Sequence, residues 1–216
     1  MDRTPSGPLV DLLCRTLDVA LAATMLIVLM PVMAVIALLI RLDSAGPIVF
    51  RQRRLGQSLA PFTVHKFRTM RDGVAHDVHR EFVLGLIAGE RPASTPGRPQ
   101  YKLSADARVT AVGQVLRRTS LDELPQLWDV IRGKMSLVGP RPPIPYEVEH
   151  YPAHWFGRFA VRPGMTGLWQ VSGRSRLALE EMIALDLEYV RRRSLGLNLV
   201  ILLRTVPAVL SLRGAC

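Results

Sequence analysis

The sequence is poor in aromatic residues and has almost no cysteine. Aromatic side chains make up 6% of its 216 residues, and Cys14 and Cys216 are the two cysteines. Because aromatics are scarce and no recognisable nucleic-acid-binding motif occurs, no nucleic-acid partner is expected. The two cysteines lie at opposite ends of the chain and form no motif, so we predict reduced thiols rather than a disulfide.

The common nucleotide and hydrolase motifs are also missing. No G-x-x-x-x-G-K-[ST], G-x-G-x-x-G or G-x-S-x-G occurs, which argues against a P-loop kinase, a dinucleotide enzyme and a serine hydrolase. His76 and His79, like His150 and His154, have spacings that zinc ligands use. Since no H-E-x-x-H motif is present and no cysteine lies near them, a zinc site is disfavoured.

Charge and hydropathy together favour a membrane. The chain has 28 Lys and Arg against 18 Asp and Glu, a net charge of +10, so an anionic partner is expected. The mean hydropathy is +0.20, which is high for a basic soluble protein. A membrane surface or a phosphorylated substrate therefore fits better than nucleic acid.

One long apolar segment runs from Val19 to Ile40, with Thr24 as its one polar side chain. A straight helix of that length reaches roughly 33 Å, enough to cross the hydrocarbon core. A signal peptide is disfavoured because acidic Asp2 and Asp11 precede the segment and no basic n-region does. A buried core helix is the remaining alternative, and it would need protein on every side.

Pro31 lies near the middle of this segment and is expected to bend the helix sharply. Two topologies are compatible with that bend. The segment either spans the membrane, with Arg41 and the following arginines in the cytoplasm, or enters, breaks at Pro31 and leaves by the same face. The residues alone do not separate the two.

The next segments predict a β-hairpin. The short runs Ile48–Arg51 and Phe62–Lys66 resemble strands and are joined by the turn-rich stretch Gly56–Pro61. The basic residues of this region are expected at the level of the lipid headgroups; they are Arg51, Arg53, Arg54, Lys66, Arg68 and Arg71.

Further helices are expected along the chain. Asp77–Leu86 is compatible with a short helix, and Ala88–Gln100 reads as a surface loop. A helix is predicted after Pro125, ending at Gly133. A second is predicted over Leu177–Arg193, where Asp186 falls on the apolar stripe and needs a partner. The tail Leu199–Leu212 is too short to span a membrane and is expected to lie against it.

The adjacent carboxylates Asp122 and Glu123 are the strongest candidate site. Ser120 and Glu123 match a capping box, but this register places Pro125 inside a helix, where it is costly. With Asp122 as the N-cap, Pro125 falls in the first turn instead. Neighbouring residues on a helix point about 100° apart, so the pair cannot flank a sugar as glycosidase carboxylates do. One carboxylate can attack while the other holds a metal.

A carboxylate that attacks phosphorus forms an acyl phosphate. That chemistry needs cations around the phosphoryl oxygens, and usually Mg²⁺ on the leaving diphosphate. Enough basic side chains are present for this role: Lys66, Arg68, Arg117, Arg118, Arg141 and Arg162. A Mg²⁺-dependent phosphoryl-transfer enzyme at a membrane is therefore one prediction. The rival readings are a non-catalytic basic membrane protein that binds anionic lipid, and a nucleic-acid-binding protein, against which the apolar segment counts.

Several motifs in order resemble the bacterial sugar transferases, the monotopic phosphoglycosyl transferases that start surface polysaccharide and glycan synthesis. They are "RTLDVALAA" with Pro31, "GPIVFRQRRLG", "KFRTM", "RVTAVGQVLRRTSLDELPQLWDVIRGKMSLVGPRP", "RPGMTGLWQVSGR" and "LDLEYV". The match extends over almost the whole chain. Met30 departs from the small polar residue that often precedes the proline in the family.

The resemblance implies a reaction. A nucleotide diphosphate sugar, usually a UDP-sugar, would bind with Mg²⁺, and Asp122 would attack its sugar-bearing phosphate and release UMP. Undecaprenyl phosphate would then take the phosphosugar from Asp122. Glu123 would help Asp122 to hold Mg²⁺, and basic side chains would contact phosphate at Lys66, Arg68, Arg117 and Arg141. The loop residues Arg162, Thr166 and Gln170, with Asp186, are weaker candidates for contacts to the substrate.

The resemblance also implies an architecture. We expect a predominantly helical α+β fold, with residues 1–42 as an N-terminal arm and re-entrant membrane helix broken at Pro31. Residues 43–216 would form a catalytic domain with a β-hairpin and helices lying along the membrane. The expected location is the cytoplasmic face of the bacterial inner membrane. Neither the sugar nor an oligomeric state follows from the motifs.

Overall fold

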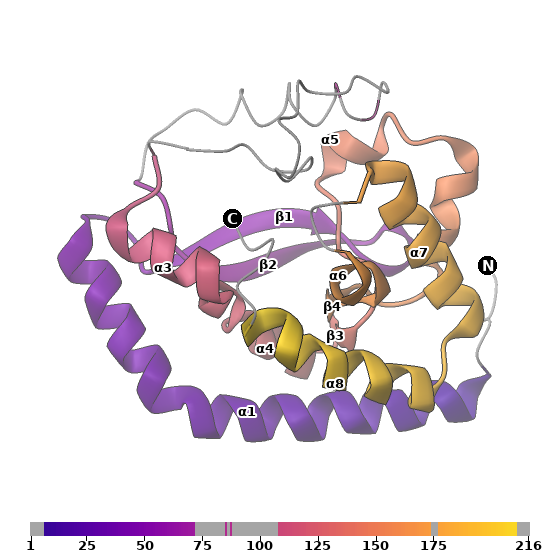
Figure 1. Ribbon diagram of the computed structural model, residues 1–216, viewed down its shortest axis with the longest axis horizontal. Helices are drawn as coiled ribbons and strands as arrows, with labels where there is room; N and C mark the ends of the chain where they lie inside the picture. The colour runs from indigo at the N-terminus through magenta and orange to yellow at the C-terminus, as the bar shows by residue number, and fades with distance from the viewer. Residues whose placement is uncertain (1–6, 72–84, 86, 88–107, 174–176, 211–216) are drawn as a thin grey trace.

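A computed structural model describes residues 7–71, 85, 87, 108–173 and 177–210. Over these ranges the chain is mainly helical, with a small amount of β-structure (Figure 1). The predicted α+β class is therefore confirmed. The helix predicted over Asp77–Leu86 and the loop predicted over Ala88–Gln100 fall almost entirely outside the described residues.

The apolar segment belongs to a helix of 36 residues, α1 (Pro8–Asp43). The helix is bent (Figure 1) and contains Pro31, the residue type that most often causes a sharp kink, since it lacks an N–H and crowds the preceding turn. The prediction that the helix breaks at Pro31 was wrong in one respect. The α-helix continues through the proline and bends rather than ending there.

One face of α1 packs on the protein while most of its surface is exposed. In its most apolar 18-residue window 11% of the residues are buried, and the helix is long and apolar enough to cross a bilayer. The alternative of a buried core helix is therefore wrong. Its exposed apolar side chains include Ile27, Val28, Met30, Val35 and Leu38, which are 58–69% exposed.

The predicted hairpin is present and longer than expected. Strand β1 (Val49–Leu55) pairs antiparallel with β2 (Pro61–Phe67), and Phe50 lies opposite Lys66. The connection contains a single 3₁₀ turn, η1 (Gln57–Leu59). Lys66 therefore lies on β2 itself, and Arg68 follows directly after the end of the strand.

Helices and 3₁₀ turns make up most of the remaining chain. Two arrangements in it matter for the site: η2 separates α3 from α4, and α7 leads into α8, which runs beside α1 in Figure 1. In chain order the elements are α3 (Ala111–Thr119), η2 (Leu121–Glu123), α4 (Gln126–Ile131), α5 (Pro145–Val148), η3 (Ala153–Ala160), α6 (Leu168–Ser172), α7 (Leu179–Arg192) and α8 (Leu195–Leu210).

Two short strands form a second, parallel pair that the sequence analysis did not predict. Strand β3 (Ser136–Val138) pairs with β4 (Gly164–Thr166). Gly139 follows β3 and lies against Gly164, where a Cβ atom would lie 2.0 Å from the backbone nitrogen of Gly139. Only residues without a side chain allow this approach, which fixes the start of the loop that carries Arg141.

The main hydrophobic core joins α1 to the rest of the protein. Ala22 and Ile40 of α1 belong to the same buried cluster as Val64 of β2, Leu127 of α4 and Ile201 of α8. Two polar residues of α1 add specific contacts. Arg15 donates to the carbonyls of Val130 and Ile131 at 2.7 and 2.8 Å. The buried carboxylate of Asp18 accepts from the Ser136 hydroxyl and the Leu137 N–H at 2.7 and 2.9 Å.

Candidate active site

Asp122 and Glu123 lie in the 3₁₀ turn η2, between α3 and α4. Ser120 precedes the turn with φ of 59°, a left-handed conformation that reverses the chain direction after α3. Both carboxylate residues are partly exposed, whereas the residues that follow them, from Leu124 to Leu127, are buried. The pair thus lies at the surface end of a buried segment.

Both sequence-based interpretations of the local helix start were wrong. The Ser120 side chain makes no capping hydrogen bond, and the residue in the N-cap position of α4 is Pro125. The capping box fails because a left-handed Ser120 cannot adopt the extended backbone of an N-cap. The predicted helix end is confirmed, because Gly133 with φ of 75° follows the last turn.

Lys66 pairs directly with Glu123. Its Nζ lies 2.6 Å from Glu123 Oε1, and the two side chains are 23% and 36% exposed. An exposed ion pair of this kind contributes little to stability, about 0–1 kcal/mol. Its value is therefore positional, because it sets an ammonium group beside the carboxylate pair.

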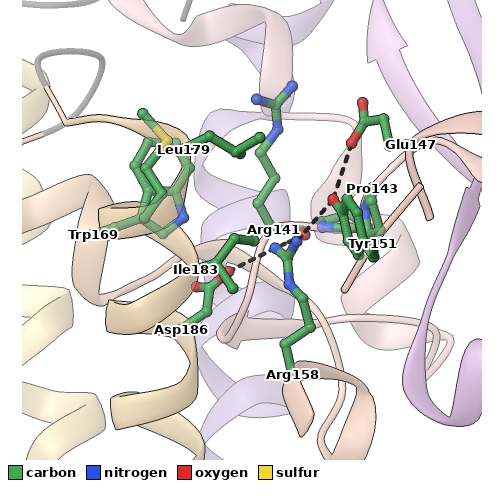
Figure 2. Close-up of a pocket in the computed structure, with 11 residues that line it drawn as sticks. Arg141, Pro143, Glu147, Tyr151, Arg158, Trp169, Leu179, Ile183 and Asp186 are labelled. Atoms are coloured by element: carbon green, nitrogen blue, oxygen red, sulfur yellow. Dashed lines mark hydrogen bonds and ion pairs between the residues drawn. The ribbon is translucent and has the colours of Figure 1, made fainter. Parts of the chain in front are cut away.

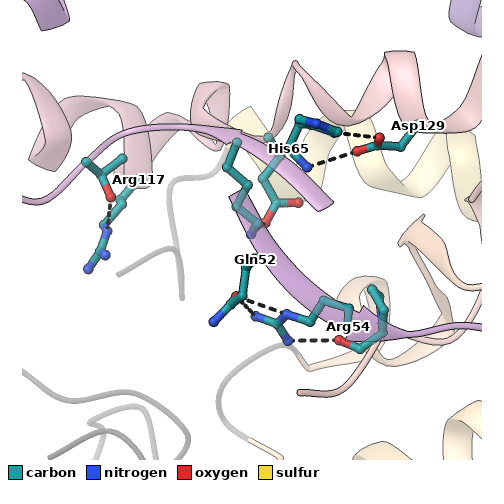
Figure 3. A network of polar contacts seen from close by, with 9 residues as sticks. Gln52, Arg54, His65, Arg117 and Asp129 are labelled. Atoms are coloured by element: carbon teal, nitrogen blue, oxygen red, sulfur yellow. Dashed lines mark hydrogen bonds and ion pairs between the residues drawn. The ribbon is translucent and has the colours of Figure 1, made fainter. Parts of the chain in front are cut away.

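A second contact joins the same strand to the helix that follows the pair. His65, the neighbour of Lys66, donates its backbone N–H to Asp129 Oδ2 at 2.9 Å. The His65 ring nitrogen Nδ1 lies 2.7 Å from Asp129 Oδ1 (Figure 3). This pair was not predicted from the sequence, since a lone histidine and an aspartate 64 positions apart carry no pattern.

Two of the predicted phosphate-binding arginines lie after β2 and on α3. Arg117 Nε donates to the Thr69 hydroxyl at 2.9 Å (Figure 3). Arg68 is 5% exposed, and its Nη2 donates to the backbone oxygen and the hydroxyl of Ser44. Arg68 thus joins β2 to the end of α1, and its predicted location at the headgroup level was wrong.

Arg54 was also predicted at the headgroup level and is buried instead. Its Nη1 donates to the carbonyl of Pro142 at 2.8 Å, and its Nε and Nη2 donate to the Gln52 side chain (Figure 3). The Leu55 N–H adds a bond of 3.0 Å to the carbonyl of Pro143. These contacts attach the Gly-Pro-Arg-Pro loop, with Arg141, to the end of β1.

Asp186 is buried, as its place on the apolar stripe of α7 required. It is 1% exposed, and its Oδ2 lies 2.6 Å from Nη2 of Arg158. Burial raises the pKa of this carboxyl to about 6, and the Arg158 charge opposes the rise. The same Nη2 donates to the carbonyl of Arg141 at 2.8 Å, so the ion pair also supports the Arg141 loop.

The Asp186–Arg158 pair lines a pocket with Arg141 (Figure 2). Arg158 Nη1 donates to the Tyr151 hydroxyl at 3.2 Å, and that hydroxyl donates to Glu147 at 3.4 Å. The network was not predicted, because its acid and base come from α7 and η3 and no local pattern relates them.

The side chains of the loop residues named from the sequence have different surroundings. The Thr166 hydroxyl lies 2.8 Å from that of Thr205 on α8. The side-chain Oε1 of Gln170 lies close to Gly167, and it is buried without a hydrogen-bond partner among the described residues. Arg162 is partly exposed, and its carbonyl lies against Gly139.

The carboxylate pair fits a magnesium ion that shares its ligands with a substrate. Mg²⁺ is usually bound by one or two carboxylates together with substrate phosphates and waters. Asp122 and Glu123 are two partly exposed carboxylates in one turn, which matches that ligand set. Within the described residues there is no group of three His, Cys, Asp or Glu side chains that could hold a metal by itself.

The site combines a partly exposed carboxylate pair with a lysine beside it, on a fold with a long exposed apolar helix, and this combination fits a group-transfer enzyme at a membrane. Comparison with known proteins agrees. Residues 10–212 match the family described as bacterial sugar transferase. The chain belongs to this family and is a transferase.

Three relatives illustrate the similarity. The exopolysaccharide production protein ExoY of Sinorhizobium fredii is 41% identical over 201 residues, 93% of this chain and 87% of that protein. A UDP-glucose:undecaprenyl-phosphate glucose-1-phosphate transferase of Caulobacter vibrioides is 40% identical, over 98% of this chain and 76% of that protein. The undecaprenyl-phosphate galactose phosphotransferase of Salmonella typhimurium is 38% identical, over 93% of this chain and 41% of that protein.

Proposed function

We propose that the chain transfers a sugar-1-phosphate from a nucleotide diphosphate sugar, a UDP-sugar, to undecaprenyl phosphate and releases UMP. The name of the Caulobacter relative supports this donor and acceptor class, and the name of the Salmonella relative supports the acceptor. The observation that carries the proposal is the Lys66–Glu123 ion pair of 2.6 Å, because Glu123 lies in the same turn as Asp122. The reaction would be the initiating step of exopolysaccharide, capsule, O-antigen or glycan synthesis.

In the first half-reaction, a carboxylate oxygen of Asp122 attacks the sugar-bearing phosphorus of the donor. The bond from that phosphorus to the bridging oxygen breaks, and UMP leaves with the bonding electrons. The product is an acyl phosphate that links Asp122 to the sugar phosphate. Asp122 suits this role because it is partly exposed and lies beside Glu123, which pairs with Lys66.

In the second half-reaction, a phosphate oxygen of undecaprenyl phosphate attacks the same phosphorus. The bond to Asp122 breaks, and the carboxylate is regenerated. The product is a polyprenyl diphosphate sugar. Neither step needs a general base, since both nucleophiles are anions.

The basic residues supply charge where the phosphoryl oxygens must lie. Lys66 is beside the carboxylate pair, and we propose Arg117 on α3 and Arg141 on the Gly-Pro-Arg-Pro loop as further phosphate contacts. Asp122 and Glu123 would hold Mg²⁺, which neutralises charge on the leaving diphosphate. Arg68 is proposed to support phosphate binding indirectly, because its contact with Ser44 fixes the end of β2 next to Lys66.

The proposed location is the cytoplasmic face of the inner membrane, with α1 as a re-entrant helix. The exposed apolar side chains of α1 and its bend support insertion into lipid. The nucleotide sugar is a cytoplasmic metabolite, so the catalytic turn would face that side. With both ends of α1 on one face, the helix would turn near Pro31.

Mass spectrometry of the purified protein with Mg²⁺ and a panel of UDP-sugars, without lipid acceptor, tests the covalent step. We expect an adduct of sugar-phosphate mass on the Asp122 peptide, together with UMP, and neither in Asp122→Asn. Donor binding without adduct or UMP release would contradict the proposal and favour a non-catalytic protein that binds anionic lipid. The panel also identifies the sugar.

A further inference from the structure

Asp129 makes two hydrogen bonds to one residue of the neighbouring strand. Its Oδ2 accepts from the His65 N–H at 2.9 Å, and its Oδ1 lies 2.7 Å from His65 Nδ1. Asp129 is 1% exposed and the His65 side chain is 23% exposed, so both contacts are partly shielded from water. Shielded charge-assisted hydrogen bonds are stronger than exposed ones. This contact is therefore a firm attachment between β2 and α4.

This contact joins the two segments that carry the Lys66–Glu123 ion pair. His65 is the residue before Lys66 on β2, and Asp129 lies on α4, which follows the turn that carries Glu123. Any movement of β2 relative to α4 at this point would move the Lys66 ammonium relative to the Glu123 carboxylate.

The hairpin needs such an attachment, because two strands alone are marginally stable. Its far end is tied to the Gly-Pro-Arg-Pro loop through Arg54 and Leu55. His65 lies opposite Arg51 in the register, four residues from the Leu55–Pro61 pair at that far end. Asp129 therefore helps to hold the half of the hairpin that carries Lys66, together with Val64 in the core and Arg68 at the end of β2.

We propose that Asp129 is a positioning residue of the transfer reaction, which through His65 holds Lys66 in register with Glu123. The inference rests on the proposed function. It adds a requirement outside the carboxylate pair and its phosphate contacts. Asp129 touches neither substrate nor metal in this role, and it acts only through the geometry of β2.

Substitutions at Asp129 separate geometry from charge. Asp129→Asn keeps an oxygen that accepts from the His65 N–H, and its amide can donate to Nδ1 when the ring hydrogen moves to Nε2. Asp129→Ala removes both contacts. His65→Phe removes only the ring contact and keeps the backbone one. A positioning role predicts that Asn rescues, that Phe is intermediate and that Ala is worst.

The geometry can be read without any turnover, by acylation of lysines with an N-hydroxysuccinimide ester followed by peptide mass spectrometry. Lys66 in its ion pair should react slowly, and Glu123→Gln should set the rate for an unpaired Lys66. In Asp129→Ala we expect Lys66 labelling to rise to the Glu123→Gln rate. In Asp129→Asn labelling should stay at the wild-type rate.

Formation of the Asp122 adduct gives the functional readout on the same proteins. Small misplacement of a catalytic group can reduce the rate about 100-fold, so we expect a loss of roughly 10- to 100-fold in Asp129→Ala at saturating donor. Asp129→Asn should stay within about threefold, and His65→Phe should fall between the two.

Ser136→Ala is the matched structural control. It deletes a buried hydrogen bond of similar length, 2.7 Å to Asp18, which joins β3 to α1 and does not contact β2. It should lower the melting temperature but leave Lys66 labelling unchanged.

The two proposals fail differently. A wild-type protein that forms no adduct with any donor contradicts the proposed function, whatever the labelling shows. Unchanged Lys66 labelling in Asp129→Ala, or equal losses in Asp129→Asn and Asp129→Ala, contradicts the positioning role. If Asp129→Ala does not fold, His65→Phe decides, and wild-type labelling together with a wild-type adduct rate would overturn the inference.

Discussion

Lys66 combines a small role in stability with a large proposed role in catalysis. Lys66→Met should lower kcat/KM by roughly 100-fold, in the range seen when one preorganised electrostatic contact to a transition state is removed. The melting temperature should hardly change, because the ion pair with Glu123 is partly exposed and contributes at most about 1 kcal/mol. Steady-state kinetics and thermal unfolding of the same preparation measure both quantities.

Arg192→Met is the control for that substitution. It removes an exposed ion pair of the same length, 2.6 Å to Glu188 on α7. Both kcat/KM and stability should stay at the wild-type level. An equal loss of activity in the two variants would show that general surface charge, and not the Lys66 contact, matters.

Asp186 should make stability depend on pH in an unusual direction. Its pKa is about 6 in the folded protein because burial opposes ionisation, against 3.8 for the unperturbed group. The folded state therefore binds more protons between these values, and the contribution of Asp186 to stability is largest at low pH and falls as the pH rises through 6. Each pH unit within the window changes it by about 1.4 kcal/mol.

Asp186→Asn isolates this contribution because asparagine does not titrate. The free energy of unfolding of the wild type minus that of the variant should decrease from pH 4.5 to pH 6.5 and then level off. Denaturant unfolding in detergent at several pH values measures it. A difference that is flat, or that rises with pH, would contradict the raised pKa.

Among the elements, the parallel pair β3–β4 depends on glycine. Gly164→Ala would place a Cβ atom 2.0 Å from the Gly139 nitrogen, so the strands would have to separate, which should cost about 1–3 kcal/mol or more. Activity should fall too, because the Arg141 loop starts at Gly139. Gly196→Ala, on α8 with no atom within 4 Å of the new Cβ, should be neutral or slightly stabilising by melting temperature.

At the level of the helix, Pro31 is expected to cause the bend of α1. Pro31→Ala restores an N–H donor and removes a ring clash, so the helix should straighten and become more stable locally. If the helix is re-entrant, straightening would move one of its ends toward the opposite membrane face. Cysteines placed at residues 9 and 42 should both react with a membrane-impermeant reagent from the cytoplasmic side in the parent protein, and only one should in Pro31→Ala.

The sequence predicted those elements whose signals are local. The hairpin follows from two adjacent β-runs and a turn, and the apolar length of α1 and the stripe of α7 follow from periodicity. The pair β3–β4 was missed because each strand has three residues and they are 28 positions apart. Ser120 was misjudged because a left-handed serine is rare and the capping-box pattern assumes extended backbone.

The site was predictable in its residue types but less so in its partners. Family motifs pointed to Asp122, Glu123 and Lys66, and the structure brings Lys66 and Glu123 together. The partners of Asp186 and His65 come from distant segments, Arg158 and Asp129. Arg54 and Arg68 were placed at the headgroups for the same reason. Their partners, Pro142 and Ser44, are distant in the sequence, so no local pattern shows that these arginines are buried.

At the scale of the whole molecule, α1 and α8 present apolar side chains on neighbouring surfaces. Leu203 and Val206 on α8 are 73% and 58% exposed. Leu203→Glu with Val206→Glu should weaken binding to liposomes, since each buried leucine or valine contributes about 1.5–3 kcal/mol and a buried charge costs more. Flotation with phospholipid vesicles measures the bound fraction.

Ala184→Glu is the control, because Ala184 is exposed on α7. It adds charge without removing an apolar side chain from α8, and it should leave flotation unchanged. If the α8 double variant also floats as the wild type does, α1 alone holds the protein at the membrane, and α8 is a solvent-facing helix.

The contacts of Arg15 and Asp18 make the membrane helix part of the catalytic scaffold. Arg15 closes the end of the helix that begins beside the carboxylate turn, and Asp18 holds the strand that leads to Arg141. A shortened protein that starts after Asp43 would lose these contacts together with the apolar side chains that cover Leu127 and Val64. The apolar helix and the segments that carry the site therefore form one folding unit. A water-soluble version would require polar substitutions on the exposed face of α1 rather than deletion of the helix.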